Sequence, residues 1–222
     1  MTFDTRTLTK IPLFEGLTEK QITDVMPCLG AVIKGYKKNN IIFLEGDKAN
    51  IFGVVLYGSV RAEKEDYNGN RSVINVIEKY NLFGEAYSFS GIESFPVSMV
   101  AAEDCSVMLI ESVRIHSSCI NSCDIHRLLF RNLLKIVSRK NLVLSRKIEF
   151  MSKRTTKEKL MSYLFAESEQ AGSKSFKIPF DRQELADFLG VERSAMSAEI
   201  GKLRDEGIIE VDRSNFKILK YQ

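Results

Sequence analysis

The first half of the chain alternates between apolar and polar residues in short runs that are separated by turn residues. The runs lie at residues 31–36, 41–44, 52–56, 60–64, 73–77, 97–101 and 106–110. This period of two predicts a series of short strands. Between the fourth and fifth runs, Asn68-Gly69 favours a two-residue type I′ hairpin, which needs positive φ angles. Strands at this spacing predict an antiparallel β jelly roll or barrel, which covers its own edges.

The pattern becomes helical after Cys123, and neither Gly nor Pro interrupts it up to Thr155. Asp124 is a suitable N-cap, and a helix of about 27 residues would be roughly 40 Å long. One small roll cannot cover such a helix, so we expect part of its apolar stripe to pack on the same helix of a second subunit. The residues predicted to form this dimer contact are Leu129, Leu133, Ile136, Val137 and Leu144. Burial of the whole helix within its own chain is the alternative.

The last seventy or so residues predict a winged helix-turn-helix. Helices are expected at 156–170, 182–189 and 193–206, followed by strands at 208–211 and 216–219. Ala186 is small where the second and third of these helices would cross, and Gly190 takes the tight turn between them.

The third of these helices separates an apolar face from a small, polar one. Its apolar positions are Met196, Ile200 and Leu203. At about 100° per residue, the outward positions are Ser194, Ala198 and Gly201, with Ser197 at the edge. A small, polar face can lie against base edges, so we predict double-stranded DNA as the partner. The residues expected to contact it are Arg182, Gln183, Arg193, Ser194, Ser197, Ala198 and Lys202. Arg193 could reach a guanine or a phosphate, whereas Lys202 is better placed for phosphate.

Composition and charge narrow the class of protein. The chain has 222 residues and is 44% hydrophobic, which suits two packed domains. No apolar run approaches the roughly 20 residues of a membrane-spanning helix, and the N-terminus does not resemble a secretory signal. We therefore expect a soluble, cytoplasmic protein with no membrane partner and with reduced cysteines. Residues 124–150 hold seven Lys or Arg against two acidic residues. This excess of basic residues indicates either a solvated helix face or a surface with an electrostatic role.

Motifs along nearly the whole chain resemble one family of bacterial transcription factors. They are Ile11-Pro12-Leu13-Phe14-Glu15-Gly16-Leu17-Thr18, Glu45-Gly46-Asp47, Gly58, Asn68-Gly69, Phe83-Gly84-Glu85, Arg182-Gln183-Glu184-Leu185-Ala186 and Asp205-Glu206-Gly207-Ile208-Ile209. Their order and spacing resemble the cyclic-AMP receptor protein and fumarate–nitrate reduction regulator (Crp/Fnr) family.

The resemblance implies an α+β chain of three parts. These are an effector-sensing jelly roll like a cyclic-nucleotide-binding domain at 1–112, connecting and dimerisation helices at 113–150, and a DNA-binding winged helix-turn-helix at 151–222. It also implies a homodimer that reads a palindromic operator and contacts RNA polymerase.

Departures from the family pattern bear on the effector. Members that bind cyclic nucleotides hold the phosphate with an Arg-Ser pair, where this chain has Phe95-Pro96. Because neither residue supplies a cation, cyclic AMP is not the expected ligand. The iron–sulfur members carry clustered N-terminal cysteines, and Cys28 alone lies in that region, so no cluster is expected either. Arg193 matches a base-reading arginine of the family, but Ser194 and Ala198 replace a Glu and an Arg, which leaves the operator sequence open.

A small-molecule effector would be expected near the Gly84-Glu85 turn of the roll. The predicted lining is Tyr57, Arg61, Phe83, Gly84, Glu85, Phe89 and Phe95. An uncharged or less polar ligand suits the absent phosphate grip, and a regulator without a ligand is the alternative. Glu85 could equally be a turn-capping carboxylate.

Three other functions are alternatives to a DNA-binding regulator. His116, Cys119, Cys123 and His126 have a spacing that would align soft-metal ligands on one helix, which allows a metal- or redox-responsive regulator acting through Cys119 and Cys123. One straight face cannot surround an ion, so packing and capping is the preferred interpretation. A jelly-roll enzyme would need several histidines inside the roll, but both histidines follow the last predicted strand, so no catalytic residue is expected. The third alternative function is a scaffold whose helix-turn-helix binds another protein.

Overall fold

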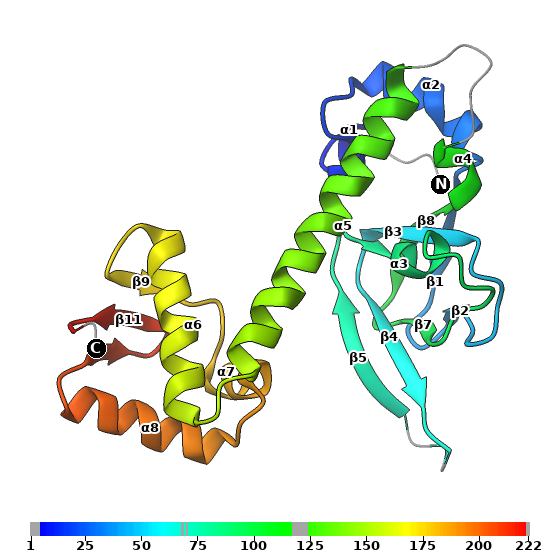
Figure 1. Cartoon of the computed structure of the whole chain (residues 1–222). Coiled ribbons are helices and arrows are strands. Elements are labelled where there is room, and N and C mark those ends of the chain that lie inside the picture. The colour runs from blue at the N-terminus through cyan, green and yellow to red at the C-terminus, as the bar shows by residue number, and fades with distance from the viewer. Residues whose placement is uncertain (1–4, 68, 70, 117–123, 221–222) are drawn as a thin grey trace. The chain divides into compact units, whose positions relative to one another are not determined.

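The chain forms two compact units, Met1–Ser138 and Arg139–Gln222, in a computed structural model that describes residues 5–67, 69, 71–116 and 124–220 (Figure 1). The border between the units falls inside the long helix α5 (Asp124–Met151), so the predicted connecting segment contributes to both. Among the described residues, no helix is long and apolar enough to cross a membrane.

The first unit contains the predicted antiparallel roll, built from two four-stranded sheets. The strand orders are β1-β8-β3-β6 and β2-β7-β4-β5. The strands are β1 (Val32–Tyr36), β2 (Ile41–Phe43), β3 (Ile51–Tyr57), β4 (Val60–Glu65), β5 (Arg71–Ile77), β6 (Leu82–Phe83), β7 (Ser98–Ala101) and β8 (Cys105–Glu111). All seven predicted strands are present, and β6 was missed because two residues carry no period. Strands β4 and β5 are antiparallel neighbours with Glu65 opposite Arg71, and Asn68 of the predicted hairpin turn lies outside the described residues.

The two sheets enclose an apolar core to which both contribute. Val55 and Val107 enter it from the first sheet, and Val60 and Met99 from the second. Gly53 in β3 leaves room for this packing, because a Cβ atom there would lie only 2.1 Å from the Phe83 ring. The interior of the roll is therefore filled with side chains.

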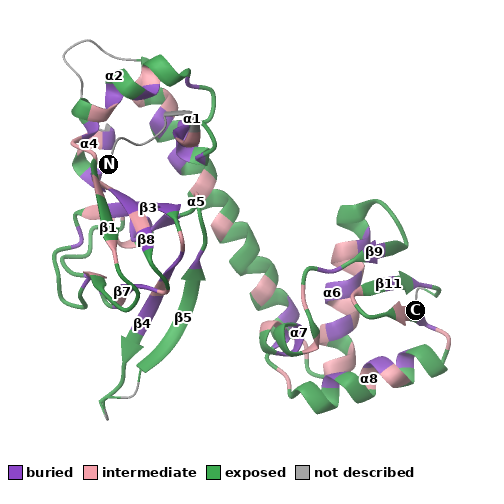
Figure 2. Ribbon diagram, turned by 180° about the vertical axis from the view of Figure 1, so that it is seen from behind, coloured by how far each residue is buried: buried purple, intermediate pink, exposed green. Residues whose placement is uncertain are grey.

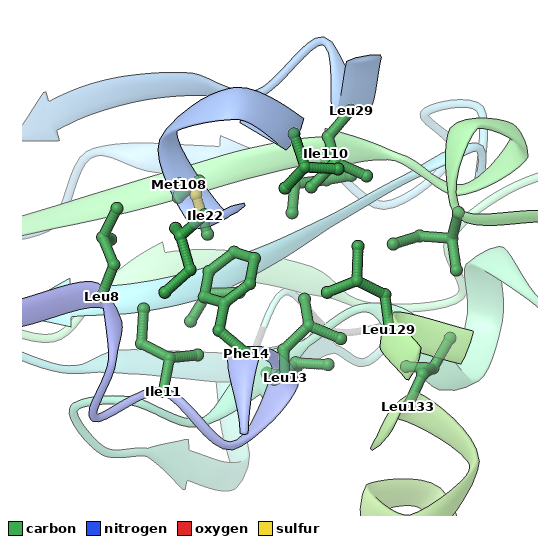
Figure 3. Close-up of a cluster of buried hydrophobic side chains, with 14 of the residues drawn as sticks. Leu8, Ile11, Leu13, Phe14, Ile22, Leu29, Met108, Ile110, Leu129 and Leu133 are labelled. Carbon is green, nitrogen blue, oxygen red and sulfur yellow. The ribbon is translucent and has the colours of Figure 1, made fainter. Parts of the chain in front are cut away.

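Helices cover the opposite face of the first sheet (Figure 3). These helices are α1 (Thr5–Leu8), the 3₁₀ turn η1 (Pro12–Phe14), α2 (Glu19–Leu29), α4 (Ser112–His116) and the first part of α5, while the short α3 (Glu85–Ser88) follows β6. Met108 and Ile110 of β8 point into this second core, since side chains alternate along a strand. The buried Asn132 of α5 also donates from Nδ2 to the carbonyl oxygens of Leu13 and Glu15, at 3.0 and 2.8 Å, which fixes α5 to the N-terminal segment.

The second unit is the predicted winged helix-turn-helix around its own core. Its helices are the last part of α5, α6 (Thr156–Ala171), α7 (Arg182–Leu189) and α8 (Arg193–Asp205). A three-stranded sheet of order β10-β11-β9 completes it, with β9 (Ser175–Lys177), β10 (Ile209–Asp212) and β11 (Asn215–Ile218). The short β9 was not predicted, and the two wing strands lie within one residue of their predicted positions.

Candidate DNA interface and effector region

The helix-turn-helix is held by caps at both ends of α7. Asp181 accepts from the backbone N–H of Glu184 at 2.9 Å, and the Glu184 carboxylate accepts from the N–H of Asp181 at 2.8 Å. Gly190 ends α7 in the left-handed region, at φ 60° and ψ 52°. Lys159 of α6 reaches the carbonyl oxygens of Leu189 and Gly190 at 3.4 Å, a tether that no sequence pattern indicated.

Helices α7 and α8 bury one face each, as predicted. Met196, Ile200 and Leu203 of α8 pack into the core with Leu185, Ala186 and Leu189 of α7. Ala186 is fully buried, which agrees with the expected close approach of the two helices.

The opposite face of α8 is open to solvent (Figure 2). The exposed residues of α8 are Arg193, Ser194, Ala195, Ser197, Ala198, Lys202, Arg204 and Asp205. Gly201 is half-buried, and a Cβ atom there would meet nothing within 4 Å. The predicted outward positions are thus exposed or, at Gly201, half-buried, and small residues lie along the helix between Arg193 and Lys202.

The predicted DNA-contact residues of α7 interact with other side chains of the same unit. The Arg182 guanidinium lies over the Phe216 ring of β11, 5.2 Å from its centroid, and burial lowers the pKa of Arg182. The Gln183 amide donates to the Asp187 carboxylate at 2.9 Å. Arg182 therefore also links α7 to the wing, a contact that sequence reasoning missed because Phe216 is far along the chain.

The predicted effector residues do not gather around one cavity. Phe83, Glu85 and Phe95 are buried in the roll, where the Phe95 ring stacks on Phe43 with centroids 4.8 Å apart and planes 6° apart. A Cβ atom at Gly84 would already lie 3.3 Å from Phe95. The position beside the Gly84-Glu85 turn is therefore occupied by the protein's own aromatic rings.

The other three effector candidates lie elsewhere. Tyr57 is exposed, and Phe89 packs on Phe52 in the core beneath the helices. Arg61 lines a cavity of about 420 Å³ on the second sheet, where it is ion-paired with Glu63 and donates to Asn39 at 3.0 Å. The prediction of one shared pocket is wrong, because β4 turns Arg61 away from the interior that Phe83 and Phe95 fill.

The predicted dimer residues on α5 divide into two sets. Leu129 and Leu133 are buried in the core of their own chain (Figure 3), and Ile136 packs against the same core. Leu129 and Leu133 are therefore not available to a second subunit, and their assignment to the dimer contact is wrong, whereas Ile136 is half-buried and stays a prediction. Val137 and Leu144 are exposed. The exposed apolar residues that lie in line with them are Phe130, Leu134, Ile148 and Met151.

Only some of the predicted metal ligands belong to the residues that the structure describes. Cys119 and Cys123 lie outside the described residues, as does the side chain of His116. His126 lies in the first turn of α5, and its buried Nδ1 has no hydrogen-bond partner among the described residues. The residues that the structure describes contain no cluster of three or more side chains suited to hold a metal.

A β-roll followed by a winged helix-turn-helix with an open recognition helix defines a class of two-domain DNA-binding regulators. Comparison with known families supports this assignment. Residues 33–120 match the cyclic nucleotide-binding domain, and residues 158–222 match the Crp-like helix-turn-helix domain. The chain belongs to the Crp/Fnr family of transcription regulators.

Two relatives are similar to the chain in sequence, and one solved structure is similar in fold. The transcriptional activator protein FnrA of Stutzerimonas stutzeri is 24% identical over 190 residues, which cover 82% of this chain and 75% of FnrA. A probable transcriptional activator of Rhizobium leguminosarum bv. viciae is 36% identical over 72 residues, covering 30% of this chain and 29% of its own. The structure of CLP from Xanthomonas campestris, described as a c-di-GMP responsive global regulator, superposes with a TM-score of 0.55 at 18% identity, over 92% of this chain and all of CLP.

Proposed function

We propose that two copies of this chain read a palindromic operator, with α8 of each copy in a major groove. The observation that carries the proposal is the division of α8 into a buried face and an exposed one. Ser194, Ser197 and Ala198 can approach base edges closely because they are small, and Arg193 at the helix start can reach a guanine or a phosphate. Glu192 makes no side-chain cap, so the first amides of α8 are also open to phosphate.

A change on the outward face tests this reading. Ala198→Glu places a carboxylate where the groove would lie, while Glu210→Ala on the wing strand β10 leaves α8 unaltered. We expect Ala198→Glu to abolish sequence-selective binding to the chain's own promoter region in a gel-shift assay and to leave the thermal midpoint unchanged. Selective binding by Ala198→Glu equal to that of Glu210→Ala would contradict the proposal.

We also propose that the two copies pair along the exposed row of α5. A homodimer requires an apolar face that its own chain leaves open, and Val137 and Leu144 belong to such a face. The chain offers a matched pair for the test, since Leu144 is 59% exposed in the row and Leu142 is 62% exposed beside it. Leu144→Glu should yield monomers in sedimentation experiments, and Leu142→Glu should not. Equal behaviour of the two variants would rule out pairing along this row.

The proposal extends to how the regulator is used in the cell. A transcription regulator acts where the chromosome is, so we place the chain in the cytoplasm and expect it to contact RNA polymerase. We propose no catalytic activity, because both histidines follow β8 and neither comes from a strand of the roll. A ligand that acts through the interior of the roll would have to displace the Phe95 ring, so such an effector and a rearrangement of this core go together.

A further inference from the structure

The exposed apolar row on α5 repeats with the heptad spacing of a coiled coil. Its positions are Phe130, Leu134, Val137, Asn141, Leu144, Ile148 and Met151, separated alternately by four and three residues. A straight helix drifts by about 20° per heptad relative to such a row, so a row that keeps this spacing fits a partner helix that supercoils with it. Six of the seven positions are apolar, and all seven are exposed in the single chain.

Asn141 is the exception within this row. With Leu134 and Ile148 it occupies the a positions of the heptads, and the remaining residues of the row are d positions. Its Oδ1 accepts a long hydrogen bond of 3.5 Å from Ser145 Oγ. Its amide N–H groups make none of the hydrogen bonds found among the residues that the structure describes, so they are available to a partner.

We propose that Asn141 fixes the alignment of the two α5 helices, by pairing with Asn141 of a second copy across the two-fold axis. The inference rests on the proposed pairing along α5 and goes beyond it. In a parallel, in-register pair the a positions face each other, so the two amides can satisfy one another. Any shift of register places each amide against an apolar side chain, where its hydrogen-bonding groups stay unsatisfied.

The charges beside the row do not fix the register of a parallel pair. The g positions of the central heptads are Lys140 and Lys147, and the e positions are Ser138 and Ser145. A lysine opposite a serine distinguishes poorly between registers, because no opposite charges meet. An antiparallel pair would bring lysines of the two copies together and would set Asn141 opposite d residues. The lysines thus disfavour the antiparallel orientation, and Asn141 distinguishes the in-register parallel pair from shifted ones.

An asparagine in this position also weakens the pair, because an apolar residue there would bury more surface. Asn141→Val should therefore associate at least about tenfold more tightly than the unaltered chain. It should also lose its single oligomeric state and sediment as a mixture of dimers and larger assemblies. Arg139→Val is the matched control, because Arg139 is exposed on the side of α5 away from the row.

The test is sedimentation equilibrium of the full-length chain without DNA, after circular dichroism has shown that each variant is folded. A second variant, Asn141→Asp, keeps the shape and brings two negative charges together, so it should weaken association at least tenfold at neutral pH. Asn141→Val and Asn141→Asp that both behave like Arg139→Val, while Leu144→Glu still gives monomers, would overturn the role of Asn141 alone. Leu144→Glu that behaves like Leu142→Glu would overturn the pairing itself, and this inference with it.

Discussion

In the proposed complex with DNA, we expect Arg193 to contact a base and Lys202 to contact a phosphate. Arg193 opens the helix next to the small outward residues, whereas Lys202 lies about two and a half turns further, 3.8 Å from the Glu199 carboxylate. Arg193→Ala should weaken binding to the specific site by about 1–3 kcal/mol and relax specificity at one base pair. Lys202→Ala should weaken binding to all sequences alike and reduce the salt slope by about one. Titrations by fluorescence anisotropy on specific and random DNA at several salt concentrations measure both.

That division fails if the two variants lose affinity equally on specific and on random DNA. Arg204→Ala serves as the control, since its guanidinium is paired with Asp205 at 3.0 Å at the end of α8. It should change neither the specificity nor the salt slope by as much as Lys202→Ala.

Replacement by alanine should have opposite effects on stability at Gly190 and at Gly201. Gly190 has a left-handed backbone, and an alanine Cβ would lie 3.0 Å from Met151 Cε, so Gly190→Ala should destabilise the second unit by about 1–2 kcal/mol. Gly201 lies within α8 with open space around its Cβ position, so Gly201→Ala should stabilise it by about 0.5–1 kcal/mol. Thermal unfolding followed by circular dichroism measures both, and a shift of the same sign in the two variants would refute the argument.

The sequence allowed the outward face of α8 to be predicted and did not allow the environment of Arg182 to be predicted. The orientation of Ser194 and Ala198 follows from helical geometry once Met196 is buried, so local pattern is enough. The stack of Arg182 on Phe216 depends on where the wing strand returns to α7, which is a tertiary property.

Among the elements, the two sheets of the roll enclose a cluster of three aromatic rings. Phe43, Phe83 and Phe95 lie together, with the Phe43 and Phe83 centroids 5.6 Å apart. Phe95→Ala should cost about 3–5 kcal/mol of stability, because it removes a buried ring and leaves a cavity. The cavity should accept a small apolar molecule such as benzene, which would raise the thermal midpoint of this variant and not that of the unaltered chain. A variant that is destabilised but gains nothing from benzene would show that the roll collapses around the lost ring.

Helix α5 shows why a predicted element does not reveal its partners. Its apolar residues form two stripes, one on the core of its own chain and one exposed. A single sequence shows that both stripes are apolar but not which of them the roll covers. The sequence pattern therefore predicts Leu129 and Leu133 in the dimer contact, whereas the roll and the N-terminal helices bury them.

At the scale of the whole molecule, a paired α5 would join two DNA-reading units into one protein. Two-fold symmetry of the protein then requires two-fold symmetry of the site, with half-sites about one helical turn apart or a multiple of it. Recognition by two heads also multiplies phosphate contacts, so affinity should fall steeply with salt.

Selection of binding sites from random DNA tests this requirement directly. The unaltered chain should enrich palindromes whose half-sites are about 10–10.5 base pairs apart, centre to centre, or twice that distance. Leu144→Glu should enrich single half-sites of the same sequence at much lower affinity, because α8 is unaltered while the pairing row is not. Leu142→Glu should enrich the palindromes, as the unaltered chain does. Enrichment of single half-sites by the unaltered chain would mean that each copy reads DNA alone, and that the exposed row of α5 serves another purpose.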